Sequence, residues 1–305
     1  MDFGKLNNIE KVDFTLPPDN PKTAEILRGL PTRSHPPHVY IGATGWGMKE
    51  WVGTYYPTGA KATDYLKAYG KQFNSIELNT THYRIPTVSD IQKWKNDTPP
   101  NFRFAPKLLQ FISHERNLGL SNNLTQQFCD AIEGLEEKLG VCFMQLPPYF
   151  GTQNMPILER FLKQFPKNIP LAIEIRQEGI FHNRKYTFEY LDILEQNNTF
   201  TVLTDVAGRR DVLHQGITGK TVVIRFVGND LHLTDYARID AWVLKLKEWF
   251  NLGLHEVYFF IHEPDSLNVP ILAQYLADKI NESFEAILAK PMSLNASKFN
   301  QISLF

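Results

Sequence analysis

The chain has 305 residues, of which 43% are apolar, so it is long enough to build one α/β barrel around a large core. Its 32 basic and 33 acidic residues give a net charge of −1, which argues against a broad polyanion-binding surface but not against a local basic groove. The two cysteines, Cys129 and Cys142, stand in apolar contexts without a C-x-x-C pair. We therefore expect buried free thiols in a reducing compartment.

Residues 1–37 are polar and rich in proline, which predicts an extension wrapped on the surface with a short helix near 23–30. The start of the chain lacks the apolar core of a signal peptide, and no run of about 18 apolar residues follows. We therefore expect a cytoplasmic protein without a membrane segment. The barrel is expected to span residues 38–290, followed by a C-terminal tail at 291–305.

Short segments rich in β-branched and aromatic residues predict eight β-strands along the rest of the chain. They span residues 38–44, 73–78, 102–107, 141–146, 171–176, 200–205, 221–226 and 256–262. Helical patterns occur between them, at 63–72, 88–97, 124–140, 157–165, 187–196, 238–250 and 269–280. The gap between the sixth and seventh strands is the shortest and is expected to hold little helix.

Eight repeats of strand and helix in a chain of this length favour a single (β/α)8 TIM barrel, an α/β fold. A doubly wound sheet is the alternative. No G-x-G-x-x-G motif follows the first strand, which weighs against a dinucleotide-binding fold of that kind.

Alternate residues of a barrel strand face the interior, and barrel enzymes carry their active sites at the carboxyl ends of the strands. In the fifth strand Leu171, Ile173 and Ile175 share one face, so we expect Glu174 and Arg176 to point into the barrel. The same alternation predicts a ring of polar side chains at the barrel mouth. Its expected members are Glu77, Asn79, Lys107, Gln145, Glu174, Arg176, Asp205, Arg225 and His262.

These charges also have a purely structural interpretation, in which Glu174 pairs with Arg176 or Arg225 and serves only the barrel. Burying such a pair costs desolvation energy that can exceed the Coulombic gain. Because many charged positions converge on one end of the barrel, we interpret the mouth as a functional pocket.

Seven motifs, in order along the chain, resemble the YecE-like family of unknown function (DUF72). They are GATGWGMKEWVGTYYP (42–57), FNSIELNTTHYRIP (73–86), TPPNFRFAPK (98–107), ISHER (112–116), QLPP (145–148), AIEIR (172–176) and IRFVG (224–228). The resemblance covers about residues 38–285 and implies a TIM barrel, without an established reaction.

The resemblance also implies which residues of this chain belong to the family's motifs. They are Gly42, Gly45, Trp46, Asn74, Glu77, Asn79, Thr81, Tyr83, His114, Gln145, Pro147, Pro148, Glu174, Arg176 and Arg225. The chain departs from the family pattern at Thr44, where Ser is usual, at His82, where Phe is common, and at Val227, where the pattern has His. The last change removes a hydrogen-bonding side chain beside the seventh strand.

Carboxylates beside several cations suit an anionic ligand, because guanidinium groups bind phosphate or carboxylate oxygens in pairs. We therefore expect an enzyme, a hydrolase or a lyase, that acts on a small anionic or phosphorylated substrate. Glu77, Glu174 and Lys107 are the expected catalytic residues, with a carboxylate exchanging protons with the substrate. The expected substrate-binding residues are Asn79, Tyr83, His114, Gln145, Arg176, Arg225, Trp46, Asp205 and His262.

A catalytic metal would need converging oxygen and nitrogen ligands, which Glu77, Glu174, Asp205 and His262 offer. The cations expected in the same space would repel the ion, and no H-x-H or H-E-x-x-H spacing occurs. We therefore expect neither a metal nor another cofactor. A G-x-S-x-G nucleophile elbow is also missing.

Two other classes of function remain open. Basic and aromatic residues interleave at 81–86, 102–107 and 112–117, a pattern typical of nucleic-acid binding or of a nuclease-like barrel similar to endonuclease IV. The balanced net charge disfavours strong nonspecific binding of nucleic acid. A non-catalytic ligand-binding barrel is the third class, since a fold does not imply an activity.

Overall fold

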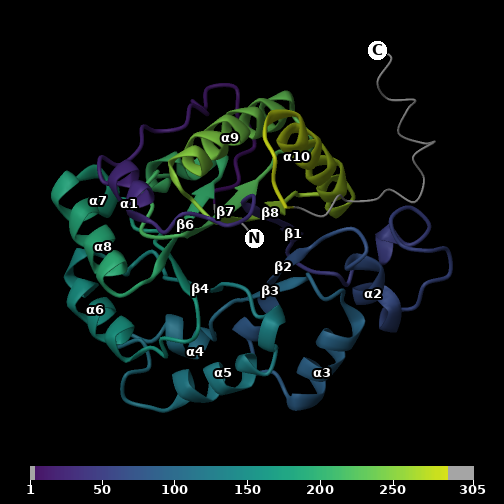
Figure 1. The fold of residues 1–305 in the computed structure, drawn as a ribbon, viewed down its shortest axis with the longest axis horizontal. Helices are drawn as coiled ribbons and strands as arrows, with labels where there is room; N and C mark the ends of the chain where they lie inside the picture. The colour runs from purple at the N-terminus through teal and green to yellow at the C-terminus, as the bar shows by residue number, and fades with distance from the viewer. Residues whose placement is uncertain (1–3, 288–305) are drawn as a thin grey trace.

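Eight parallel strands surround one axis in the computed structural model, which describes residues 4–287 (Figure 1). Their bounds are β1 His38–Ala43, β2 Ser75–Leu78, β3 Arg103–Pro106, β4 Cys142–Gln145, β5 Leu171–Glu174, β6 Phe200–Asp205, β7 Thr221–Val227 and β8 Glu256–His262. Each strand coincides closely with one of the expected segments, because each segment is a short apolar run that a parallel sheet buries on both faces.

Neighbouring strands pair in the order β3-β2-β1-β8-β7-β6-β5-β4. The first strand pairs with the last, as a barrel requires and a doubly wound sheet does not. Between β3 and β4 the ring is joined by a bridge of Lys107 to Phe143 and by a 2.8 Å hydrogen bond from Leu108 N to Phe143 O. The sheet is therefore a nearly closed (β/α)8 TIM barrel.

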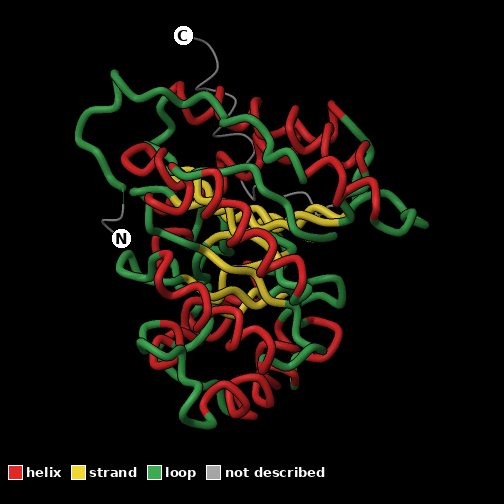
Figure 2. Tube along the Cα trace, turned by 90° about the vertical axis from the view of Figure 1, so that its left-hand side faces the viewer, coloured by secondary structure: helices red, strands yellow, loops and turns green. Residues whose placement is uncertain are grey.

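Helices follow the strands and form the outer layer around them (Figure 2). The α-helices of the described residues are α1 Thr23–Gly29, α2 Tyr65–Tyr69, α3 Val88–Asp97, α4 Gln110–Ser113, α5 Leu124–Glu133, α6 Met155–Gln164, α7 Gly179–His182, α8 Arg184–Gln196, α9 Leu233–Leu252 and α10 Val269–Ser283. Short 3-10 helices are η1 Lys49–Trp51, η2 Ala62–Asp64, η3 Asn79–His82, η4 Glu136–Lys138, η5 Thr152–Asn154, η6 Ala207–Val212 and η7 Ser266–Asn268.

Local sequence explains where these helices begin and end. Helix α3 begins after Thr87, because the Asp90 amide donates to the Thr87 hydroxyl at 3.2 Å and the Asp90 carboxylate accepts from the Thr87 amide at 2.9 Å. The helix expected over 124–140 is shorter than predicted, since α5 ends at the C-cap Gly134 and η4 follows. The connection between β6 and β7 holds only η6, as its short length predicted.

An apolar plug fills the middle of the barrel interior, between polar side chains at the two ends of the strands. Its buried members are Tyr40, Ala105, Val141, Phe143, Ala172, Phe200, Val202, Val223, Tyr258 and Phe260. The rings of Tyr40 and Tyr258 stack 4.6 Å apart within this plug. On the carboxyl side of this plug, the strand ends carry polar side chains that line a cavity.

Residues 4–37 run over the surface of the barrel as expected. The Thr23 hydroxyl at the start of α1 donates to Gln215 O at 2.8 Å. Before α1, residues 4–9 reach the open end of the barrel, where most of them line the same cavity. Within residues 4–287 no helix is both long and apolar enough to cross a membrane. The expected tail at 291–305 lies outside the described residues.

Candidate functional site

The alternation of side chains along the strands brings charged groups together at the open end of the barrel. Ala172 and Val223 belong to the apolar plug, and each precedes a charged residue by two positions. Because residues two apart on a strand share a face, Glu174 and Arg225 point inward, one level nearer the carboxyl end. Glu77 reaches the same level from β2.

Arg225 is at the centre of the resulting network. Its Nε and Nη2 donate to the two carboxylate oxygens of Glu77 at 2.8 and 2.9 Å, and its Nη1 donates to Glu174 at 2.6 Å. The other oxygen of Glu174 accepts from Arg176 Nε at 2.6 Å. We call these four residues the charged floor. Each carboxylate holds a guanidinium group in a fixed orientation, which preorganises the arginines for a ligand.

Neutral and basic side chains surround the charged floor. His262 Nε2 lies 2.9 Å from Glu77 Oε2, and Asn79 Nδ2 donates to Glu77 Oε1 at 3.0 Å. Lys107 Nζ donates to Gln145 Oε1 at 2.9 Å. These residues lie together at the mouth, where the alternation along their strands predicted them.

Among the buried groups at the base of this site positive charge exceeds negative charge, while the exposed Asp230 and the half-buried Glu263 also line the cavity. The carboxylates of Glu77 and Glu174 face Arg176, Arg225 and Lys107, which leaves one positive charge in excess. Burial raises the pKa of each carboxyl group, but this effect is outweighed by Arg225 and His262 at Glu77 and by Arg176 and Arg225 at Glu174. The pKa of Glu77 therefore lies well below its usual range and that of Glu174 falls to about 2, so both are ionised at neutral pH.

The shift in the pKa of Lys107 favours the neutral form of its side chain. Burial, with repulsion from Arg225, lowers the pKa of its ammonium group from 10.5 to about 8. Within residues 4–287 this ammonium group forms no ion pair, and its hydrogen bond goes to the neutral amide of Gln145. Lys107 is therefore a basic residue of the site that can release a proton close to neutral pH.

A cavity of about 700 Å³ lies over the charged floor, a size typical of small-molecule sites. We call it the mouth cavity. Lys107, Arg176 and Arg225 line it, whereas Glu77 and Glu174 are 0% and 1% exposed and lie outside its lining. The other lining residues include Thr44, Met48, Asn79, Tyr83, Thr204, Val227, Asn229, Asp230, His232, His262, Glu263 and Ser266, together with part of residues 4–9. The two carboxylates thus support the cations that a ligand would meet.

Thr204 is a mouth residue that the sequence did not indicate. Phe200 and Val202 belong to the apolar plug, so Thr204 is the next inward residue of β6. It lines the mouth cavity, is 4% exposed, and its hydroxyl oxygen has no hydrogen-bond partner among the described residues. A buried hydroxyl without a partner is a group that a ligand or a water molecule would satisfy.

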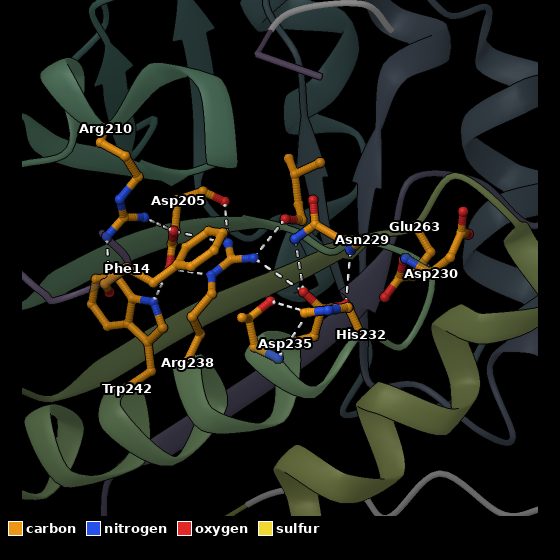
Figure 3. Close-up of polar contacts among 12 residues, drawn as sticks. Phe14, Asp205, Arg210, Asn229, Asp230, His232, Asp235, Arg238, Trp242 and Glu263 are labelled. Atoms are coloured by element: carbon orange, nitrogen blue, oxygen red, sulfur yellow. Dashed lines mark hydrogen bonds and ion pairs between the residues drawn. The ribbon is translucent and has the colours of Figure 1, made fainter. Parts of the chain in front are cut away.

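The prediction that Asp205 belongs to the mouth is wrong. Phe200, Val202 and Thr204 are the residues of β6 that face inward, so Asp205 points outward, to α9 and η6 (Figure 3). Its carboxylate accepts from Trp242 Nε1 at 2.7 Å, pairs with Arg238 Nη2 at 2.8 Å, and also pairs with Arg210. The polar end of the segment FTVLTD is compatible with either phase of the alternation along the strand, which explains the error.

Trp46 is also absent from the lining of the mouth cavity. Its ring packs edge-on against Trp94 with centroids 6.2 Å apart, and both line a separate groove of about 220 Å³. The chain turns away from the barrel axis after β1, so Trp46 reaches α3 instead. Trp46 is therefore a poor candidate for a wall of the mouth cavity.

Tyr83 and His114 occupy the rim of the barrel. Tyr83 lines the mouth cavity and remains 65% exposed. His114 is exposed and does not line the cavity, although burial of its ring and the charge of Lys107 lower its pKa. Its carbonyl accepts from the Tyr149 hydroxyl at 2.7 Å, and its ring lies 5.5 Å from that of His82.

Among residues 4–287, no group of three or more His, Cys, Asp or Glu side chains is arranged to hold a metal ion. The acidic groups of the floor are instead held by arginines. The expectation of a metal-free site stays a prediction.

Comparisons with known proteins agree with the fold. The chain is 27% identical over 271 residues to UPF0759 protein YecE of Escherichia coli K12, covering 83% of this chain and 96% of that protein. It is 28% identical over 151 residues to UPF0759 protein YunF of Bacillus subtilis 168, covering 47% of this chain and 52% of that protein. A crystal structure of the DUF72 family protein EF0366 from Enterococcus faecalis V583 superposes with a TM-score of 0.65 at 20% identity, covering 81% of this chain and 99% of that one.

A family model described as "Protein of unknown function DUF72" matches residues 40–296, which is most of the chain. The match includes every residue of the charged floor. The chain therefore belongs to the DUF72 family.

Proposed function

We propose that the protein is an enzyme that binds a small anionic or phosphorylated substrate in the mouth cavity. The observation that carries this proposal is a set of three buried cations that line one cavity, Lys107, Arg176 and Arg225, which are 4%, 7% and 2% exposed. The buried carboxylates of Glu77 and Glu174 neutralise only two of these charges. Burying uncompensated positive charge is costly, so a site of this kind is well suited to an anion that neutralises it.

The arginines would bind the anion and the carboxylates would hold the arginines. Arg225 uses Nε, Nη1 and Nη2 to bind Glu77 and Glu174, and a guanidinium group has five N–H donors, so two remain for a ligand. Because its orientation is fixed before binding, Arg225 loses little conformational freedom when an anion arrives. Glu77 and Glu174 act in this scheme as positioning residues.

Lys107 is the residue we assign to proton transfer. It lines the cavity, and its pKa of about 8 is close to the pH at which a general acid or base is effective. The unpartnered hydroxyl of Thr204 would orient the substrate. Hydrolysis and elimination both need such a proton transfer, and both fit this set of residues.

Calorimetric titration with inorganic phosphate at pH 7 tests the proposal. We expect the wild-type protein to bind phosphate. Lys107→Gln should lose at least about tenfold in affinity, because it removes a buried charge contact worth about 1.4 kcal/mol or more. The control Lys67→Gln, on the exposed side of α2, should bind phosphate as the wild type does. Binding should also weaken as the pH rises through 8, because Lys107 then loses its charge. Failure of the wild-type protein to bind phosphate or sulfate at millimolar concentration would overturn the proposal.

A nucleic-acid ligand is the second candidate, and exposed aromatic side chains at the rim favour it. Tyr83, Phe111 and Tyr149 are 65%, 57% and 55% exposed and follow β2, β3 and β4 at their carboxyl ends. Flat side chains beside a cationic cavity suit stacked bases above a bound phosphate. A 5′-phosphorylated oligonucleotide that binds at least tenfold more tightly than inorganic phosphate would favour this candidate. Phosphate binding without turnover of any substrate would favour a non-catalytic ligand-binding barrel.

A further inference from the structure

The first described residues of the chain lie outside the region matched by the family model, which begins at residue 40, yet they line the mouth cavity. We propose that residues 4–9 form a movable wall of the ligand site, which controls access to Lys107 and supplies Lys5 as a further cation for the bound anion. We call residues 4–9 the N-terminal wall. The role of Lys5 rests on the proposed function, whereas the control of access to Lys107 does not.

The wall is docked on η6 through a close approach of two glycines. Gly208 N donates to Gly4 O at 2.8 Å. A Cβ atom at position 208 would lie 2.7 Å from Gly4 O, so a side chain there would force the two backbones apart. Gly4 itself has a φ of +74°, and a Cβ atom there would meet the side chain of Val206 at 2.9 Å. The contact therefore depends on glycine at both positions.

A second anchor holds the chain behind the wall, at Phe14 (Figure 3). The guanidinium carbons of Arg238 and Arg210 lie 4.9 and 5.5 Å from the centre of the Phe14 ring. Arg210 Nη2 also donates to Phe14 O at 3.1 Å and to Thr15 O at 3.2 Å. Both arginines pair with the buried carboxylate of Asp205. The residue that sequence reasoning assigned to the mouth thus serves the attachment of the N-terminal segment.

Between these anchors the chain is held by local contacts. Within the described residues, Glu10 N donates to Asn8 Oδ1 at 2.8 Å and Val12 N donates to Ile9 O at 3.0 Å. Lys5 is exposed, and Leu6 is 41% exposed although it lines the cavity. A segment with few buried contacts opens at low free-energy cost. Loss of the Gly4–Gly208 contact would therefore swing the wall away while Phe14 stays in place.

The positive charges that line the cavity favour closure of the wall on a bound anion. Lys107, Arg176 and Arg225 line the cavity at the carboxyl ends of the strands, and Lys5 lines it from the N-terminal wall. Without a ligand these positive charges repel one another, which opposes closure of the wall. A bound phosphate or carboxylate would attract Lys5 and the cations at the strand ends at the same time, so binding and closure would be coupled.

Acetylation of the full-length protein by acetic anhydride at pH 8 tests access to Lys107 directly, with the modification of Lys107 quantified by mass spectrometry of the peptide that contains it. We expect Lys107 to react several-fold faster in Gly208→Ala than in the wild type. Gly29→Ala is the control, because a Cβ atom at that position meets nothing within 4 Å. Phe14→Ala, which releases the second anchor, provides an independent variant if Gly208→Ala disturbs η6. Unchanged reactivity of Lys107 in both folded variants would overturn the inference.

Phosphate titration of Lys5→Gln tests the ligand contact, with Lys11→Gln as the matched control from the same exposed segment outside the cavity lining. We expect a three- to tenfold loss of affinity in Lys5→Gln alone. If the wild type binds phosphate and both variants bind it equally well, Lys5 makes no contact and the proposed function stands. If the wild type binds no phosphate but Gly208→Ala exposes Lys107, the wall exists and the anionic substrate class is wrong.

Discussion

Replacing Glu174 by glutamine preserves the shape of the floor and removes one charge from its centre. Burial alone would raise the pKa of Glu174, but Arg176 and Arg225 hold it at about 2, compared with an ordinary value of 4.5. The difference of about 2.5 corresponds to about 3 kcal/mol of stability at neutral pH, at 1.36 kcal/mol per pH unit. The cost of leaving a buried charge without its partner, about 3–5 kcal/mol, agrees with this value.

The pH dependence of the stability that Glu174→Gln loses identifies the cause of this loss. A carboxyl group whose pKa is lowered by folding stabilises the protein fully above pH 4.5 and loses this contribution as the pH falls towards 2. Urea unfolding of the wild type and Glu174→Gln, followed by tryptophan fluorescence from pH 7 to pH 3, should therefore show a gap of about 3 kcal/mol that narrows below pH 4.5. Glu189→Gln, an exposed carboxylate on α8, is the control and should match the wild type. A loss below about 1 kcal/mol that is the same at every pH would refute the electrostatic account of the floor.

Two further predictions concern residues near the mouth. Burial raises the pKa of Glu263 to about 8, so the folded protein keeps this proton at pH values where the unfolded chain has lost it, and stability should fall as the pH rises from 4.5 to 8. Glu263→Gln should flatten this slope by up to about 1.4 kcal/mol per pH unit in urea unfolding, and an unchanged slope would contradict the prediction. Trp46→Phe should leave phosphate affinity within about twofold of the wild type, a difference of about 0.4 kcal/mol, because Trp46 lines the separate groove. A tenfold loss in calorimetry would place Trp46 in the ligand site.

The sequence predicted the barrel and most of the mouth because both depend on local patterns. Short apolar runs mark the strands, and alternation within LAIEIR and FNSIEL predicts that Glu174 and Glu77 face inward. Alternation fails where a segment carries apolar residues on both faces, as in FTVLTD, and there Asp205 was predicted in place of Thr204.

Other features of the site depend on contacts between distant segments, which local patterns do not contain. Nothing in the order of residues indicates that the arginines lie between the carboxylates and the cavity, although this arrangement changes the roles expected for Glu77 and Glu174. The placement of Lys5 at the mouth depends on the contact between Gly4 and Gly208, which are far apart in the chain.

Crystallography with an anomalous scatterer tests most directly whether the mouth cavity binds an anion through buried cations. Crystals of the full chain soaked in selenate, a tetrahedral anion similar in size to sulfate and phosphate, would be measured at the selenium edge. We expect an anomalous peak in the mouth cavity, from a selenate ion whose oxygens accept hydrogen bonds from Lys107 and Arg225, and we expect this peak to be lost in Lys107→Gln. Selenate bound only at surface lysines, with the mouth cavity of the wild type free of the anion, would contradict this expectation.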